Sequence, residues 1–295
     1  MTTTAPASCL GRAPREGARL RLFCFHHAGG GASFFSSWPG RLPVDVDVLP
    51  VQLPGREARY REPRFQDAGE VVEALGRDLA PRLDEGPWAA YGHSMGAMVA
   101  FALTAARLRE GGRPPEALFL GAYAAPYVSP SLPPPDRYDD HELARLLVDF
   151  GGLSPRFLGR DDWLRVLLPI LRDDLRVCAT HHRAGLPDPD DERARLPLHV
   201  EAFAGVDDPL VTPGAVRAWG RYVNSFRMTT VPGGHFFRAR HPIRSSTGSA
   251  LRWPGFSRNW AHHLRHPVDA SLDLVGVLLV QLGLLLDARH DPQRA

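Results

Sequence analysis

The chain of 295 residues contains no lysine and only three cysteines. Arginine therefore supplies all of the fixed positive charge, which we interpret as coding bias, although guanidinium groups also suit phosphates and carboxylates. Cys9, Cys24 and Cys178 are odd in number, far apart and without a C-x-x-C pair. This pattern excludes a disulfide framework and a zinc site built on paired cysteines. It indicates a reduced, cytoplasmic protein in which Cys24 is a small core side chain.

A long uninterrupted hydrophobic run is also missing. The segment from Met1 to Leu20 has no apolar stretch of signal-peptide length, so we expect no export signal and a flexible leader over residues 1–19. The apolar run from Leu272 to Leu286 is short and interrupted by Gln281, which argues against a membrane span. We expect this run to form a buried helix within an atypical C-terminal extension, residues 238–295.

A strong charge of one sign is absent as well. The formal net charge of +2 argues against a general nucleic-acid-binding protein, which is normally far more basic. With 44% hydrophobic and 23% charged residues, the composition is that of an ordinary globular protein. The length suits one large α/β domain or two small ones.

Strand-like and helix-like patterns alternate along most of the chain. This order predicts an α/β fold with a mostly parallel central sheet flanked by helices. We expect strands at Leu20–Phe25, Val44–Val51, Trp88–Tyr91, Ala117–Ala122, Leu198–Ala204 and Phe226–Val231, and helices at Ala68–Leu83, Met95–Arg109 and Pro213–Val223.

The alternation stops between residues 126 and 196. This segment is rich in proline at first and then has helical, amphipathic patterns at His141–Phe150 and Trp163–Val177. A helical block between two strands of a sheet enzyme suggests an inserted lid over the active site. Ordinary flanking helices are the alternative.

The pentapeptide Gly92-His93-Ser94-Met95-Gly96 lies between a predicted strand and a predicted helix. This is the context of a G-x-S-x-G nucleophile elbow, a strained turn that leaves the serine hydroxyl exposed at the sheet edge. Side chains at the two glycine positions would collide with neighbouring elements. We therefore predict that Ser94 is a nucleophile.

A serine nucleophile needs a base, and the base needs an acid that fixes its tautomer. His235 follows a strand in Pro232-Gly233-Gly234-His235 and is the candidate base. The loop after the preceding strand contains Asp207 and Asp208; we favour Asp208 as the acid, with Asp207 as the alternative. In α/β-hydrolases the order along the chain is likewise serine, acid, histidine.

The reaction also needs backbone donors for an oxyanion. We predict the amide of Met95, directly after the nucleophile, and the amide of Ala28 in the glycine-rich turn after the first strand. A phosphate-binding P-loop is disfavoured because no Lys-Ser/Thr follows the glycines. We expect no metal at His26-His27, His181-His182 or His262-His263, because adjacent histidines rarely chelate one ion together.

Several ordered motifs resemble type II thioesterases, the free-standing editing enzymes of polyketide and nonribosomal peptide synthesis. The similar segments are His27-Ala28-Gly29-Gly30 with Ala32-Ser33-Phe34-Phe35 and Trp38, Gln52-Leu53-Pro54-Gly55-Arg56, the elbow, Leu168-Pro169-Ile170-Leu171-Arg172-Asp173-Asp174, Gly205–Val211 and Gly233–Phe237. The resemblance spans about residues 20–237, the expected α/β-hydrolase domain. Two features depart from it: His26 stands where family members usually have proline, and residues 238–295 do not match. A lineage-specific addition and a reading-frame error both remain open for this tail.

The resemblance implies hydrolysis of an acyl thioester on the phosphopantetheine arm of an acyl or peptidyl carrier protein, with no cofactor. Acyl-CoA is a further possible acyl donor. The same acyl-serine chemistry serves a carboxylesterase, a lipase or an acyltransferase, which stay as alternatives. A non-catalytic module that binds carrier proteins is the alternative from another class. Acyl-chain preference, pathway and oligomeric state are not encoded in these motifs.

Overall fold

The computed structural model describes residues 8–126, 128, 134–183, 191, 195–237 and 282. Within them, six parallel strands form one sheet in the order β2-β1-β3-β4-β5-β6. The predicted α/β class is therefore confirmed. The strands are β1 (Leu20–Phe25), β2 (Val46–Val51), β3 (Trp88–His93), β4 (Leu118–Gly121), β5 (Leu196–Gly205) and β6 (Val223–Val231).

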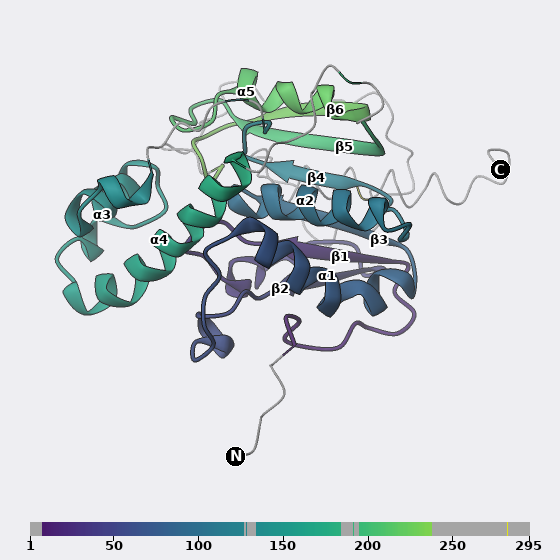
Figure 1. Ribbon diagram of the computed structural model, residues 1–295, viewed down its shortest axis with the longest axis horizontal. Helices are drawn as coiled ribbons and strands as arrows, with labels where there is room; N and C mark the ends of the chain where they lie inside the picture. The colour runs from purple at the N-terminus through teal and green to yellow at the C-terminus, as the bar shows by residue number, and fades with distance from the viewer. Residues whose placement is uncertain are drawn as a thin grey trace, which may run out of the picture.

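Alternating side chains divide the core between the two faces of the sheet. Phe23 and Phe25 of β1 belong to the core cluster under helices α1 (Ala68–Asp84), α2 (Met95–Arg109) and α5 (Pro213–Arg217). Leu22 and Cys24 belong to a second cluster, which includes Phe35 of the 3-10 helix η1 (Ala32–Phe35) and Trp38. Figure 1 shows α1 and α2 side by side on one face of the sheet.

A helical insertion stands between β4 and β5. It contains α3 (Asp140–Asp149) and α4 (Asp161–Arg183), together with short 3-10 turns at Pro135–Arg137 and Pro155–Phe157. α3 begins with a capping box in which Asp139 and Glu142 bond each other's backbone amides. The insertion has its own apolar cluster, built from Leu143, Ala144, Leu164, Leu168 and Leu171. In Figure 1 it projects from the side of the sheet.

Several predicted boundaries differ from those of the structure. The leader over residues 1–19 is not separate from the domain from Ser8 onward, because Cys9 and Leu10 are buried in the core and the Cys9 carbonyl accepts from the Gln52 amide at 2.8 Å. The helix expected at Pro213–Val223 ends at Arg217 and continues as a 3-10 turn to Arg221. The edge strand β6 begins at Val223, before the predicted Phe226, because the exposed Asn224 and Ser225 interrupt its apolar pattern.

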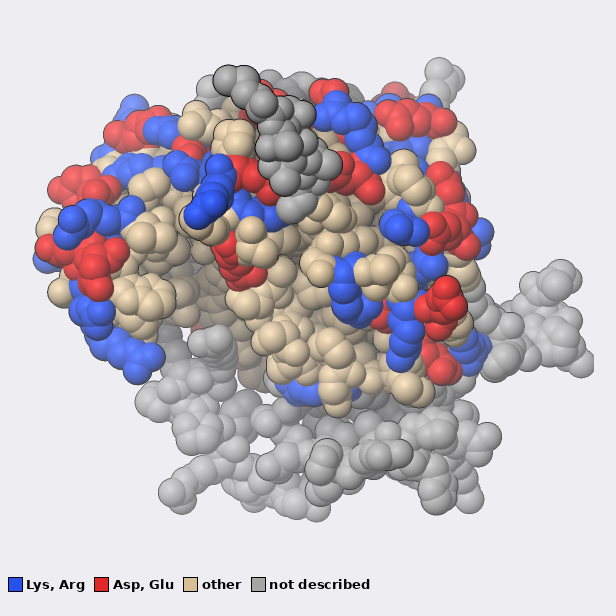
Figure 2. Space-filling view, turned by 90° about the horizontal axis from the view of Figure 1, so that it is seen from below, with Lys and Arg blue, Asp and Glu red and all other residues tan. Residues whose placement is uncertain are grey.

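The exposed face in Figure 2 mixes basic and acidic side chains without a region of one sign. On the helical insertion many of these charges are paired, as in Arg160–Asp162, Arg172–Asp140 and Arg176–Asp136. No helix among the described residues is long and apolar enough to cross a membrane. The predicted C-terminal helix lies outside the described residues except for Leu282, which is helical and fully buried in the second cluster.

Candidate active site

Ser94 occupies the sharp turn that joins β3 to α2. Its backbone has φ 53° and ψ −122°, a conformation that L-residues rarely adopt, and its amide donates to the Gly121 carbonyl at 2.8 Å. A Cβ at Gly92 would lie 2.1 Å from the Gly96 carbonyl oxygen, and one at Gly96 would lie 2.0 Å from the Phe25 oxygen. Backbone contacts therefore require glycine on both sides of the serine, as the elbow motif predicted.

His235 connects Ser94 to Asp208. Its Nε2 lies 2.9 Å from Ser94 Oγ and its Nδ1 lies 2.9 Å from Asp208 Oδ2. The other carboxylate oxygen of Asp208 accepts from the Leu210 and Val211 amides, so the side chain is fixed and buried. Because a carboxylate only accepts, Nδ1 of His235 carries the proton and Nε2 accepts from the serine hydroxyl.

The structure separates the two aspartates that the sequence left open. Asp208 points toward His235, whereas Asp207 is exposed and its backbone amide donates to the Gly233 carbonyl. The loops after β5 and β6 also touch, since a Cβ at Gly205 would lie 2.5 Å from the Gly234 oxygen. This close approach brings the acid and the histidine together.

His93 holds the backbone of His235 from inside the elbow. Its Nε2 lies 2.9 Å from the His235 carbonyl oxygen, and its Nδ1 lies 2.9 Å from the Tyr91 hydroxyl. The carbonyl only accepts, so Nε2 donates and Nδ1 accepts from the tyrosine. Burial, together with the positive charge that His235 and His27 can carry, holds the pKa of His93 well below its usual value. No role was predicted for the side chains of Tyr91 and His93, although their i, i+2 spacing on a strand places them on one face.

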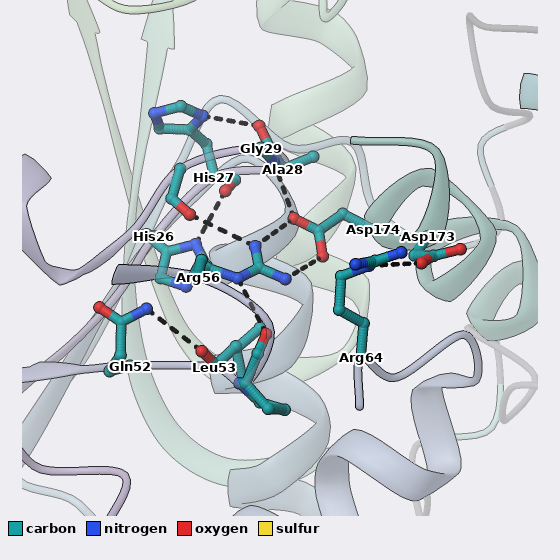
Figure 3. Close-up of polar contacts among 12 residues, drawn as sticks. His26, His27, Ala28, Gly29, Gln52, Leu53, Arg56, Arg64, Asp173 and Asp174 are labelled. Carbon is teal, nitrogen blue, oxygen red and sulfur yellow. Dashed lines mark hydrogen bonds and ion pairs between the residues drawn. The ribbon is translucent and has the colours of Figure 1, made fainter. Parts of the chain in front are cut away.

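The glycine-rich loop after β1 lies beside Ser94, because Phe25 and Gly92 are register partners in adjacent strands. Its backbone is held by the segment that follows β2. Gln52 accepts from the Ala32 amide at 2.8 Å, and Arg56 donates to the Gly30 carbonyl at 3.3 Å. Figure 3 shows this segment packed under the loop. The sequence analysis noted the segment only as a family motif.

The two predicted oxyanion donors are the backbone amides of Met95 and Ala28. Met95 is the first residue of α2, where backbone N–H groups have no partner within the helix. Within the described residues, the amide of Ala28 makes no hydrogen bond to another protein group. Two backbone donors and a serine–histidine–carboxylate relay are the components of acyl-transfer chemistry.

No group of three or more metal-ligating side chains occurs in the described part of the chain. His26 is buried, and burial together with the charge of Arg56 lowers its pKa from 6.5 to about 3, which keeps the ring neutral. His262-His263 lie outside the described residues. The three cysteines have free thiols, and burial raises the pKa of Cys24 well above its usual value.

Comparison with known proteins supports the same chemistry. The model of the family described as "Thioesterase domain" matches residues 20–245. The thioesterase PikA5 of Streptomyces venezuelae is 34% identical over 230 residues, which cover 76% of this chain and 77% of PikA5. A probable cadicidin biosynthesis thioesterase of Streptomyces griseus is 35% identical over 229 residues, which cover 77% of this chain and 61% of that protein.

A solved structure gives the same result for the fold. RedJ, a thioesterase from the prodiginine biosynthetic pathway of Streptomyces coelicolor, aligns with a TM-score of 0.68 at 34% identity. The alignment covers 80% of this chain and 89% of RedJ. These similarities confirm the resemblance that the ordered motifs predicted.

Proposed function

Because this chain belongs to the thioesterase family, with the α/β-hydrolase fold, we propose that it releases acyl groups from the phosphopantetheine arm of acyl or peptidyl carrier proteins. Its relatives are named for antibiotic biosynthesis, which favours polyketide or nonribosomal peptide assembly lines as the setting. The observation that carries the proposal is the Ser94–His235–Asp208 relay, with both hydrogen bonds at 2.9 Å.

In the proposed mechanism, Ser94 Oγ attacks the thioester carbonyl while its proton passes to Nε2 of His235. Asp208 stabilises the imidazolium through Nδ1–H. The amides of Ala28 and Met95 donate to the oxyanion of the tetrahedral intermediate. The C–S bond then breaks, and His235 protonates the departing thiolate. The acyl group remains on Ser94 as an ester.

Water completes the cycle. His235 takes a proton from the water molecule as it attacks the acyl-serine carbonyl, and returns it to Ser94 Oγ as the ester bond breaks. The products are a carboxylic acid and the free pantetheine thiol. No step requires a metal or a redox cofactor.

Residues 8–237 form the catalytic domain in this proposal, and the helical insertion acts as a lid that shapes the acyl site. The match to the family model ends at residue 245, and in this proposal the residues after it form an extension. Free, buried cysteines favour a reducing compartment, and we place the enzyme in the cytoplasm.

The test compares hydrolysis of an octanoyl carrier protein, octanoyl-CoA and p-nitrophenyl octanoate by the wild type and by Ser94→Ala. We expect the highest kcat/KM with the carrier protein and a loss of about 10⁴-fold or more in Ser94→Ala. Intact mass should show an octanoyl adduct on the wild type only.

A higher kcat/KM for the plain ester would indicate a carboxylesterase. Transfer of the acyl group to an added alcohol or amine in preference to water would indicate an acyltransferase. Equal carrier-protein binding by wild type and Ser94→Ala, with no adduct and no turnover, would indicate a binding module.

A further inference from the structure

A buried carboxylate of the helical insertion holds the glycine-rich loop. Asp174 of α4 is 2% exposed, and its Oδ2 accepts from the Gly29 amide at 2.7 Å. The same carboxylate forms a bidentate pair with Arg56, at 2.5 and 2.8 Å (Figure 3). A charged acceptor makes a short, strong hydrogen bond to a backbone amide. The position of Asp174 therefore sets the orientation of the peptide between Ala28 and Gly29.

The peptide before Ala28 is fixed by a second contact. His26 Nδ1 lies 2.9 Å from the His27 carbonyl oxygen and donates to it, since a carbonyl only accepts. The N–H of a trans peptide points away from its carbonyl, so this bond fixes the direction of the Ala28 N–H. His27 Nδ1 also donates to the Ala28 carbonyl at 2.9 Å. The two peptides on either side of Ala28 are thus both anchored.

Packing joins the loop to the insertion as well. The Ala28 side chain contacts both the core under α1 and α2 and the apolar cluster of the insertion. Gly29 has φ +74°, and a Cβ there would lie 3.4 Å from Leu171 of α4. The loop is therefore enclosed between the sheet and α4.

We propose that Asp174, clamped by Arg56, is a positioning residue that couples the seating of the helical insertion to the oxyanion donor at Ala28. This rests on the proposed function, because it takes the Ala28 amide as a donor to the acyl oxygen. With α4 seated, the carboxylate holds the Gly29 amide and the Ala28 N–H is aimed at the site. Displacement of α4 withdraws the acceptor and lowers the rate of acyl transfer.

The adjacent residue provides a matched control. Asp173 is 4% exposed on the same turn of α4 and bonds Arg64 at 2.6 Å and Arg176 at 2.8 Å. Figure 3 shows its contact with Arg64 beside the Asp174 pair. None of the hydrogen bonds of Asp173 in the described residues reaches the glycine-rich loop. Asp173→Asn therefore breaks ion pairs of the insertion without touching Gly29.

The test uses the full chain and three variants: Asp174→Asn, Asp173→Asn and the paired replacement Arg56→Met with Asp174→Leu. Apolar replacement of both partners of a buried ion pair commonly preserves stability, so the double variant separates folding from positioning. With octanoyl carrier protein we expect kcat to fall about 100-fold in the double variant and about 10-fold in Asp174→Asn. In all three variants, KM should stay within about twofold of the wild-type value. In Asp173→Asn, kcat should also stay within about twofold of the wild-type value.

Octylboronic acid supplies an independent readout, because its adduct with Ser94 places an oxygen where the oxyanion forms. Its affinity should fall with Asp174→Asn and not with Asp173→Asn. A folded double variant with wild-type kcat would overturn the proposal, as would equal losses in the two single variants. A wild type that binds the boronic acid but hydrolyses no carrier thioester would refute the proposed function instead, while the boronic acid affinities still test Asp174.

Discussion

The Ser94–His235–Asp208 relay and the helical insertion meet at one sheet edge but are held there by different means. Ser94, Asp208 and His235 each follow the end of a strand, so the sheet register itself brings them together. The insertion is tied to that edge by side-chain contacts, among them the ion pair between Arg56 and Asp174, which are 118 residues apart in the chain, and the burial of Val177 in the core. The relay is thus built into the fold, whereas the insertion depends on a few side-chain contacts.

This difference has an energetic consequence. Close backbone packing around the relay leaves no room for a side chain at Gly92, Gly96 or Gly205. The Arg56–Asp174 pair stabilises the insertion only while both partners are present, because a buried charge without its partner is costly. Substitution of these glycines should therefore disturb the fold and the relay together, whereas loss of the ion pair should be felt most in the insertion.

The largest effect is expected from Gly96→Ala. The new Cβ would lie 2.0 Å from the Phe25 carbonyl oxygen, so β1 and α2 cannot both keep their places. We expect a loss of at least about 4 kcal/mol in the free energy of unfolding, together with loss of activity. Gly86→Ala is the control, because a Cβ there meets nothing within 4 Å. Urea unfolding compares the two, and a stable, active Gly96→Ala would show that the elbow tolerates a side chain.

Arg56→Ala should have the next largest effect, since it leaves the Asp174 carboxylate buried. We expect a loss of about 3–5 kcal/mol in the free energy of unfolding. Arg77→Ala is the control, because it removes a surface ion pair in which Arg77 is 67% and Glu73 is 72% exposed. This change should alter the free energy of unfolding by less than about 0.5 kcal/mol. Hydrogen exchange would locate the loss of protection, which we expect in α4 more than in β3. Equal losses in the two variants would show that burial of the pair has no consequence.

A smaller effect is expected from His93→Phe, which removes the donor to the His235 carbonyl. We expect kcat to fall about tenfold, or about 1.4 kcal/mol, with KM unchanged, because His235 loses part of its support. Tyr91→Phe keeps the His93 contact with His235 and should lower kcat only about twofold. Stopped-flow acylation rates would separate these effects. A KM effect without a kcat effect would place His93 in substrate binding instead.

The sequence predicted the sheet well because alternation, turn glycines and strand ends are local signals. It identified the loops that bear Ser94 and His235 for the same reason. It favoured Asp208 but kept Asp207 as the alternative, since adjacent loop residues differ only in the direction of their side chains. In the structure, amides of Leu210 and Val211 fix Asp208, a contact that no spacing rule reveals.

Long-range ion pairs could not be predicted from the sequence, for a different reason. Any arginine can pair with any carboxylate, and the chain has 35 basic and 33 acidic residues. Asp173 and Asp174 are equivalent in sequence, yet only Asp174 contacts the glycine-rich loop in the described structure. The two side chains leave the turn of α4 in different directions, and only that of Asp174 points toward the glycine-rich loop.

An effect that depends on pH concerns the contact between the two regions, where His26 is buried beside Arg56. The pKa of His26 is lowered from 6.5 to about 3, chiefly by burial and next by Arg56. Between these values the unfolded chain binds a proton that the folded chain does not, so stability falls as the pH falls through this range. For one histidine the slope approaches about 1.4 kcal/mol per pH unit well below pH 6.5. His26→Gln keeps an amide donor but does not titrate. Between pH 7 and pH 5, its free energy of unfolding, measured with urea, should fall by about 1–2 kcal/mol less than that of the wild type. His93 titrates in both proteins, so the difference isolates His26; equal slopes would mean that His26 is protonated in the folded chain and that the Ala28 peptide is held differently.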